Sequence, residues 1–264
     1  MRLLVSALVA LSIGIGAHAQ TLLLPPPNTP LPEFEVATIK PASVHYIGIL
    51  VRPGGRIEGG RCPVAYLVQE AFHAPASLVT GGPDWIRSTR FDIVAIPPED
   101  SPARRYTPPS FNAPMIDDQR FMLQALLRDR FGFRYHVDKT EQPVFFLRRS
   151  GGPLRLKPAK DPAARPFMGV IVYADGVGTG EIEGTNTTMA YTALRLSDIL
   201  HRTVIDETSL SGRWDFHVDA PDERNADLTN ATLEGMKALG LELKSGRSLV
   251  DTIAIDAVTE PTPN

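Results

Sequence analysis

GRIEG at residues 55–59 returns as GEIEG at residues 180–184, and a helix-like run follows each copy. RFDI at residues 90–93 likewise matches RWDF at residues 213–216, each after a turn that contains glycine. A third pair joins residues 127–133 to residues 233–241, in the same order along the chain. Short matches also arise by chance, but three in one order favour an internal duplication, with two related halves.

The pattern of apolar residues predicts strands and two helices in each half. In the first half we expect strands at residues 34–40, 45–51, 90–95, 133–137 and 144–148, and helices at 63–72 and 117–130. In the second half we expect strands at residues 167–173, 180–183, 213–218, 241–243 and 249–255, and helices at 188–201 and 228–239. The predicted class is α+β, with helices packed on one face of a mainly antiparallel sheet.

Proline divides the chain, because it fixes φ and removes a backbone donor. Dense proline clusters lie at residues 25–32, 97–114 and 153–166. The predicted organisation is a signal peptide (1–19), a proline-rich leader (20–33), a first half (34–149), a proline-rich linker (150–166), a second half (167–260) and a tail (261–264). Whether the halves form two domains or share one sheet stays open at this point.

The first residues are typical of a secretory signal peptide. Arg2 precedes an uncharged run over residues 3–16, and Ala17-His18-Ala19 is the small-x-small pattern that a signal peptidase accepts. We expect cleavage between Ala19 and Gln20, and hence a periplasmic or secreted protein. The alternative is a buried N-terminal helix, which the lack of an amphipathic period disfavours. No later segment is apolar enough to span a membrane.

Charge and cysteine content argue against a nucleic-acid-binding protein and against a disulfide-stabilised one. The net charge of −3 becomes −4 when Arg2 is removed with the signal, and the basic residues are scattered among acids. We therefore expect no nucleic-acid partner. Cys62 is the one cysteine of the chain, so an intramolecular disulfide is impossible. A lone cysteine without a nearby histidine or pair of basic residues is more typical of a buried apolar residue than of a nucleophile.

Histidine and serine patterns offer little catalytic chemistry. Ser150 precedes two glycines at a strand end, which indicates a turn rather than a nucleophile elbow. His136 with Asp138, and His217 with Asp219, each place two polar side chains on one strand face. Such a pair could hold an ion, but polar pairs on the exposed side of a strand are the ordinary explanation. We predict no metal site.

Paired carboxylates also have structural explanations. Asp117 and Asp118 precede a helix, where either one is expected to cap it, and Gly132 is expected to end that helix in a left-handed conformation. Asp206 and Glu207 lie in a predicted turn, where such side chains satisfy backbone donors. General acid and base catalysis by either pair is the less favoured alternative. We therefore assign no catalytic residue.

Two tryptophans and a glycine run complete the candidates. Trp85 follows the turn GGPD, and Trp214 lies in a predicted strand, so both are expected to anchor the core rather than to mark a binding surface. Glycines alternate at residues 176–180 without the lysine of a phosphate-binding loop. No cofactor is predicted.

A set of motifs resembles the Solibacter-type exported family of acidobacteria, a domain of unknown function. The motifs are FEVATIKP (34–41), GGPDW (81–85), RFDI (90–93), residues 126–133, residues 206–216 and Ile255-Asp256. The resemblance covers nearly the whole chain after the signal and implies no catalytic residues. Related domains occur attached to sensor metallopeptidases of the beta-lactam-receptor type, which implies a sensing or binding role. The chain departs from the family's DKTGLTG run at Glu207 and Ser209.

These observations lead to one functional hypothesis and two alternatives. We expect a non-enzymatic exported protein that binds an envelope protein, a peptide or a small ligand. The first alternative is an extracytoplasmic hydrolase whose site lies between the halves, for example with His136 or His217 beside an acid from the other half. The second is an assembly module that pairs through exposed strand edges.

Overall fold

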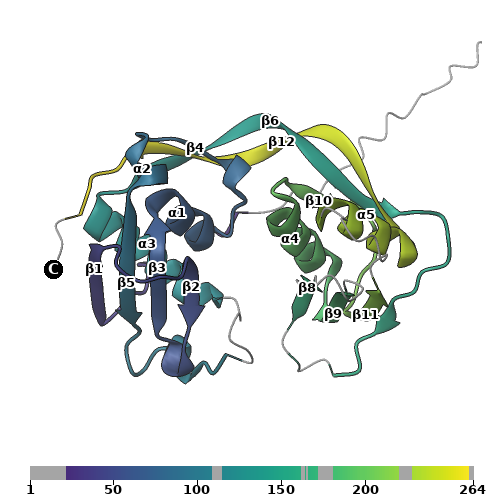
Figure 1. Cartoon of the computed structure of the whole chain (residues 1–264), viewed down its shortest axis with the longest axis horizontal. Coiled ribbons are helices and arrows are strands. Elements are labelled where there is room, and N and C mark those ends of the chain that lie inside the picture. The colour runs from purple at the N-terminus through teal and green to yellow at the C-terminus, as the bar shows by residue number, and fades with distance from the viewer. Residues whose placement is uncertain are drawn as a thin grey trace, which may run out of the picture.

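The computed structural model describes residues 22–108, 115–161, 164, 166–171, 181–219 and 228–261. The predicted signal peptide with its cleavage site, Ala19 and Gln20, lies outside these residues, as do the glycines at 176–180 and residues 262–264 of the tail. Within them the chain is α+β, with antiparallel sheets and helices on one face of each (Figure 1). The predicted α+β class, with mainly antiparallel sheets, is confirmed.

The first half holds a four-stranded antiparallel sheet with the order β1-β5-β3-β2. Its strands are β1 (Val36–Pro41), β2 (Gly48–Val51), β3 (Ile57–Pro63) and β5 (Arg90–Ile96). The helices of this half are α1 (Val64–Phe72), α2 (Trp85–Ser88) and α3 (Asp117–Phe131), with three short 3-10 helices, η1 (Pro53–Gly55), η2 (Ala76–Leu78) and η3 (Pro102–Arg105).

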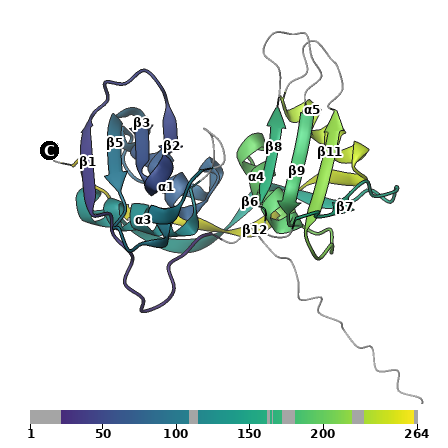
Figure 2. The same cartoon turned by 90° about the horizontal axis from the view of Figure 1, so that it is seen from below.

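The second half holds another four-stranded antiparallel sheet, with the order β7-β11-β9-β8. Its strands are β7 (Lys157–Pro158), β8 (Phe167–Ile171), β9 (Glu181–Thr187) and β11 (Trp214–Asp219), and its helices are α4 (Met189–Leu200) and α5 (Leu228–Ala238). The edge strands β2 and β8 are the sheet edges nearest to each other in both views (Figures 1 and 2). The two four-stranded sheets thus have the same pattern of strand order, whereas α2 and the 3-10 helices occur in the described residues of the first half only.

A third sheet, with the order β10-β6-β12-β4, joins the halves. It consists of β4 (Val79–Gly81), β6 (Arg134–Arg149), β10 (Val204–Asp206) and β12 (Leu241–Ala257). The two long strands pair antiparallel from Leu241 opposite Arg149 to Ala257 opposite Arg134, and they arch over both halves (Figure 1). We call this pair the β6–β12 ribbon. The short strands β4 and β10 add to it in parallel, one from each half.

The ribbon contributes side chains to both hydrophobic cores. Val144, Val250 and Ile253 are buried in the core of the first half, together with α1 and α3. Leu147 and Leu241 are buried in the core of the second half, with α4 and α5. Each core therefore has three layers, a sheet, its helices and one end of the ribbon. Since neither core is complete without both long strands, burial of apolar surface holds the halves together.

The repeated RFDI and RWDF motifs have a structural explanation. Asp92 accepts hydrogen bonds from the backbone N–H groups of Ser43, Val44 and Arg61, at 2.6 to 3.0 Å. Asp215 accepts them from the N–H groups of Asn186 and Lys160, at 2.8 and 2.9 Å. These contacts hold the pKa of both carboxyl groups below the usual value, against a desolvation effect that raises it.

Two of the residues whose N–H groups donate to Asp92 and Asp215 lie where the strand register shifts. Arg61 and Asn186 both have positive φ, 48° and 47°. Each lies near a shift in strand register, between β3 and β5 in one half and between β9 and β11 in the other. A non-glycine residue with positive φ costs free energy. The hydrogen bond from its N–H group to the carboxylate stabilises the bulge against this cost.

Several predicted boundaries were wrong. The separate strands expected at 133–137 and 144–148 form one strand, β6, and those expected at 241–243 and 249–255 form one strand, β12. Pro143 lies inside β6 opposite Arg247, at a position where the pairing with β12 continues. The proline-rich linker holds a short edge strand, β7, where proline is tolerated.

The predicted cap of α3 was also wrong. Ile116 is the N-cap residue, and its backbone N–H donates to the side chain of Gln119 at 3.0 Å. The carboxylate of Asp118 instead accepts from the hydroxyl of Ser101 at 2.8 Å, at the start of η3. Gly132 ends the helix with φ 54°, as predicted.

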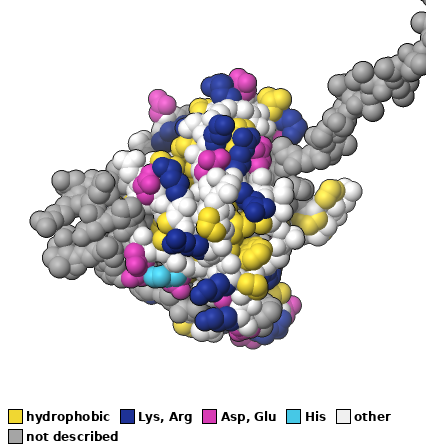
Figure 3. Space-filling view, turned by 90° about the vertical axis from the view of Figure 1, so that its right-hand side faces the viewer, with side chains coloured by type: hydrophobic (Ala, Val, Ile, Leu, Met, Phe, Trp, Pro, Cys, Tyr) yellow, Lys and Arg dark blue, Asp and Glu magenta, His cyan; other side chains and the backbone are white. Residues whose placement is uncertain are grey.

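In the described part of the chain, no helix combines the length and the apolar character needed to cross a membrane. On the face of the second half drawn in Figure 3, lysine and arginine side chains are interspersed with acidic and apolar ones.

Replacing Asp92 by asparagine should lower the free energy of unfolding by about 1–3 kcal/mol, because the new NH2 group would face backbone donors instead of accepting from them. Asp215→Asn should act in the same direction in the other half. Urea denaturation measures the free energy of unfolding of both variants. Asp129→Asn, which removes an exposed ion pair with Arg128, is the control and should change stability little. Equal effects at all three positions would contradict the role assigned to the motif.

Candidate functional site

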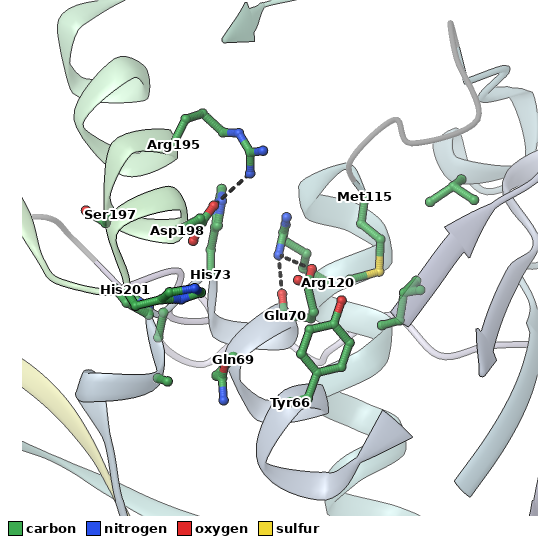
Figure 4. A pocket seen from close by; sticks show the side chains of 15 residues that line it. Tyr66, Gln69, Glu70, His73, Met115, Arg120, Arg195, Ser197, Asp198 and His201 are labelled. Carbon is green, nitrogen blue, oxygen red and sulfur yellow. Dashed lines mark hydrogen bonds and ion pairs between the residues drawn. The ribbon is translucent and has the colours of Figure 1, made fainter. Parts of the chain in front are cut away.

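A cleft of about 300 Å³ lies between the two halves and is lined by residues of both. One wall comes from the first half, through β2, the C-terminal part of α1, η2 and the start of α3. The other wall comes from the second half, through the C-terminal part of α4 (Figure 4). Clefts that gather polar groups from two parts of a chain are the default place to look for a ligand site.

The walls present matching ends of two helices. His73 follows α1 and His201 follows α4, and both residues adopt the left-handed conformation, with φ 51° and 49°. The backbone N–H of each histidine donates to a carbonyl four residues earlier, which ends the helix. Glycine or asparagine is commoner at such a position, and non-glycine residues in this conformation cluster at functional sites.

Arg120 is the most buried charge of the cleft. Its side chain is 3% exposed and extends from α3 toward α1. Nη1 donates to the backbone carbonyl of Glu70 and lies 3.4 Å from Oε2 of the same residue. Nε is buried and has no hydrogen-bond partner among the described residues. Buried guanidinium nitrogens are ordinarily paired, so Arg120 has a donor to offer.

The opposite wall carries a second ion pair. On α4, Nη1 of Arg195 donates to Oδ2 of Asp198 at 2.7 Å, and Nε of Arg195 donates to the carbonyl of Met168 in β8 at 3.4 Å. Burial raises the pKa of Asp198 to about 6, although the guanidinium of Arg195 lowers it, and the negative charge of Glu70 adds to the rise. Asp198 therefore changes its protonation state just below neutral pH.

His73 and Tyr66 stay uncharged at neutral pH. Burial lowers the pKa of His73 from 6.5 to about 2, and the positive charges of Arg120 and Arg195 lower it further. The Nε2 atom of His73 is buried and without a partner among the described residues. Burial and the neighbouring Glu70 raise the pKa of Tyr66. The cleft thus combines two neutral polar rings with two arginine–carboxylate pairs.

The structure places His136 and His217 outside this cleft. His136 lies on the ribbon, with Nδ1 2.7 Å from Asp256 and Nε2 3.2 Å from Asp138, and its side chain is 54% exposed. His217 lies 3.4 Å from Asp219 on β11 and is equally exposed. Both predicted pairs form, and each is an exposed surface pair. His136 thus meets Asp256, an acid of the predicted second half, but this pair lies on the exposed ribbon and outside the cleft.

The other sequence candidates have structural roles. Cys62 is fully buried, its thiol donates to the carbonyl of Gly60, and burial raises its pKa to about 12. The side chain of Asp206 accepts from the backbone N–H of Thr208 at 2.9 Å, as a turn residue does. Glu207 forms an ion pair with Arg148 at 2.6 Å. Asp117 lies in the first turn of α3.

The tryptophans and Ser150 also lie away from the cleft walls. Trp85 and Trp214 are partly buried against the first and second core respectively, which agrees with their predicted role as core anchors. Ser150 lies just after β6, and Gly151 beside it has φ 82°. This geometry is a turn.

Sequence reasoning missed the residues that line the cleft. One signal was present, because an acid precedes a histidine by three residues at the end of both helices, Glu70 before His73 and Asp198 before His201. Nothing in a single sequence shows that the two helix ends face each other. The sequence did not indicate that Arg120 is buried, because the polar residues Gln119 and Gln124 lie on the same buried face of α3 and blur its apolar pattern.

In the described part of the chain, no group of three or more histidine, cysteine, aspartate and glutamate side chains is arranged to hold a metal ion.

Comparison with known proteins gives one match. A family model described as "Protein of unknown function (DUF3738)" matches residues 65–258, which include most of the cleft-lining residues. No curated protein and no solved structure matches the chain.

The buried His73 predicts a loss of stability in acid. In the unfolded chain His73 takes up a proton near pH 6.5, whereas in the folded protein it stays neutral down to about pH 2, so folding becomes less favourable as the pH falls below 6.5. At about 1.4 kcal/mol per pH unit, this group costs about 2 kcal/mol between about pH 6.5 and pH 4.5. His73→Asn, which tolerates the left-handed backbone, should remove that loss.

Urea denaturation of both proteins across this pH range measures the difference. Titration of Asp198 acts in the opposite direction but is present in both proteins, so the comparison isolates His73. Parallel stability curves would show that His73 is not buried in its neutral form.

Proposed function

The chain belongs to the DUF3738 family of proteins of unknown function, and on that premise we propose that it is an exported, non-enzymatic binding protein. The proposed ligand is a peptide, a small molecule or the accessible end of an envelope component. The proposed site is the cleft between the halves.

One observation carries this proposal. Among the described residues, the buried Nε donor of Arg120 has no hydrogen-bond partner, and neither has Nε2 of His73, which lines the same cleft. Leaving such polar atoms unsatisfied costs about 1–3 kcal/mol each, which a ligand with matching polar atoms would recover. Two unpaired polar atoms that line one cleft therefore favour a binding site over a passive gap between the halves.

Export supports the same proposal. The first 19 residues have the features of a signal peptide, and the chain holds a single, buried cysteine. We therefore place the protein in the periplasm or outside the cell. The matching order of elements in the two halves supports descent from an internal duplication, which would explain why two equivalent helix ends face one cleft.

The test is a binding screen on the protein purified from the periplasm after secretion with its own leader. Amino acids, short peptides, aliphatic acids and simple sugars serve as probes, and the thermal unfolding temperature reports binding, since a ligand of the folded state raises it. Ala76→Trp fills the exposed lining of the cleft and should abolish the shift that any active probe gives. Ala238→Trp, on the exposed side of α5, is the matched control and should retain it.

A screen in which no probe class raises the unfolding temperature would contradict the proposal. Shifts that persist in Ala76→Trp would contradict it as well, because the ligand would then bind outside the cleft.

One observation favours the alternative, an extracytoplasmic hydrolase. Asp198, with a pKa of about 6, and Glu70 lie on opposite walls of the same cleft. A carboxyl group with a raised pKa, across a cleft from a second carboxyl group, is an arrangement used for general acid and base catalysis. Turnover of ester, peptide or glycoside substrates that is lost in both Asp198→Asn and Glu70→Gln would establish this alternative in place of binding alone.

A further inference from the structure

The nitrogens of Arg120 that do not contact Glu70 have the geometry of a two-pronged hydrogen-bond donor. The Nη1 atom contacts Glu70, and Nε and Nη2 lie together along another edge of the planar guanidinium group. These two nitrogens form the fork that binds a planar carboxylate through two parallel hydrogen bonds. The Nε atom is buried without a hydrogen-bond partner among the described residues, and the side chain of Arg120 is 3% exposed.

The charges around Arg120 favour a ligand with a single negative charge over one with two. The cleft holds two guanidinium groups, Arg120 and Arg195, and two carboxyl groups, Glu70 and Asp198. Glu70 lies against Arg120 itself. A monoanion gains the fork of Arg120 with modest repulsion from Glu70, whereas a phosphate dianion brings twice the negative charge close to the same carboxylate.

An apolar surface lies beside the charged groups. Ile49 and Val51 of β2, Met115 before α3, and Pro75 and Ala76 before and in η2 line the same cleft. Burying an aliphatic group there would strengthen binding, because it removes apolar surface from water. The volume of about 300 Å³ is at the small end of ligand sites, so it fits a small molecule or the last residues of a longer chain.

We propose that the cleft recognises a monocarboxylate with an adjacent apolar group, and that the carboxylate lies on the Nε–Nη2 edge of Arg120. The inference rests on the proposed binding function and names its ligand class. Two sources present this chemistry, the C-terminus of an apolar peptide and a free aliphatic acid. Arg120 is the anchoring residue, and the wall formed by Ile49 and Val51 takes the apolar group.

The test compares matched probes with the wild-type chain by isothermal titration calorimetry. N-acetyl-alanyl-valine should bind, and its C-terminal amide should bind at least ~10-fold more weakly, since it loses a charged hydrogen-bonded contact. Hexanoate distinguishes a free aliphatic acid from a peptide terminus as the source. Inorganic phosphate should not compete with either probe. This comparison needs no variant, so it stands even if Arg120 is required for folding.

Variants then locate the anchor. Arg120→Lys keeps the charge but loses the fork, and Arg120→Gln loses both, so binding should weaken in that order, by ~10-fold or more in the second. Arg128→Gln makes the same change on the exposed face of the same helix and should leave binding unchanged. Thermal unfolding of each variant shows whether it is folded.

The outcomes separate this inference from the binding function itself. Binding of the acid and the amide with equal affinity in a cleft that Ala76→Trp blocks would overturn the carboxylate assignment and leave the binding function intact. Strong competition by inorganic phosphate would overturn it as well. If none of the screened probe classes binds, the proposed function fails along with the ligand class.

Discussion

The antiparallel pairing of β6 with β12 is the interaction on which the rest of the molecule depends. Sixteen residue pairs join the two strands, which reach from the core of one half to the core of the other. Each half also adds a short parallel strand to the ribbon, β4 from the first and β10 from the second. A half deprived of the other's long strand would expose the apolar side chains that this strand covers, so the halves are expected to fold as one unit.

The cleft follows from this arrangement. The ribbon runs along one side of both halves. Their four-stranded sheets therefore lie next to each other, and β2 and β8 are the edge strands that face each other (Figure 2). The helices packed under the ribbon bring the C-terminal ends of α1 and α4 to the same space, with a histidine after each. Arg120 from α3 and Arg195 from α4 then complete a polar site whose charges are paired within each wall.

Local patterns predicted most of the elements but not the site. Gly132 and Thr188 are strong end and start signals, and α3 and α4 lie within one residue of the predicted bounds. The ribbon strands were divided in the prediction, because Pro143 and the polar residues around Gly246 resemble loops when considered alone. Their continuity comes from pairing between residues about a hundred positions apart, which periodicity does not detect.

The cleft residues depend on the same long-range pairing. His73 and Asp198 belong to helices of different halves, and an aspartate beside an arginine one turn away gives no sign in the sequence that burial will raise its pKa. The repeated motifs at Asp92 and Asp215 were visible in the sequence, but their role required the backbone donors of loops and bulges that the motifs themselves do not contain.

The most direct test of the shared ribbon uses the two tryptophans, since Trp85 belongs to the first half and Trp214 to the second. In Trp214→Phe the fluorescence reports the first half alone, and in Trp85→Phe it reports the second. Each variant is unfolded in urea and followed by fluorescence and by far-ultraviolet circular dichroism. Because the halves share the ribbon, we expect the two signals to coincide in each variant, in one transition. Separate transitions, with one half losing its fluorescence signal while the other stays folded, would contradict the dependence of both halves on the ribbon.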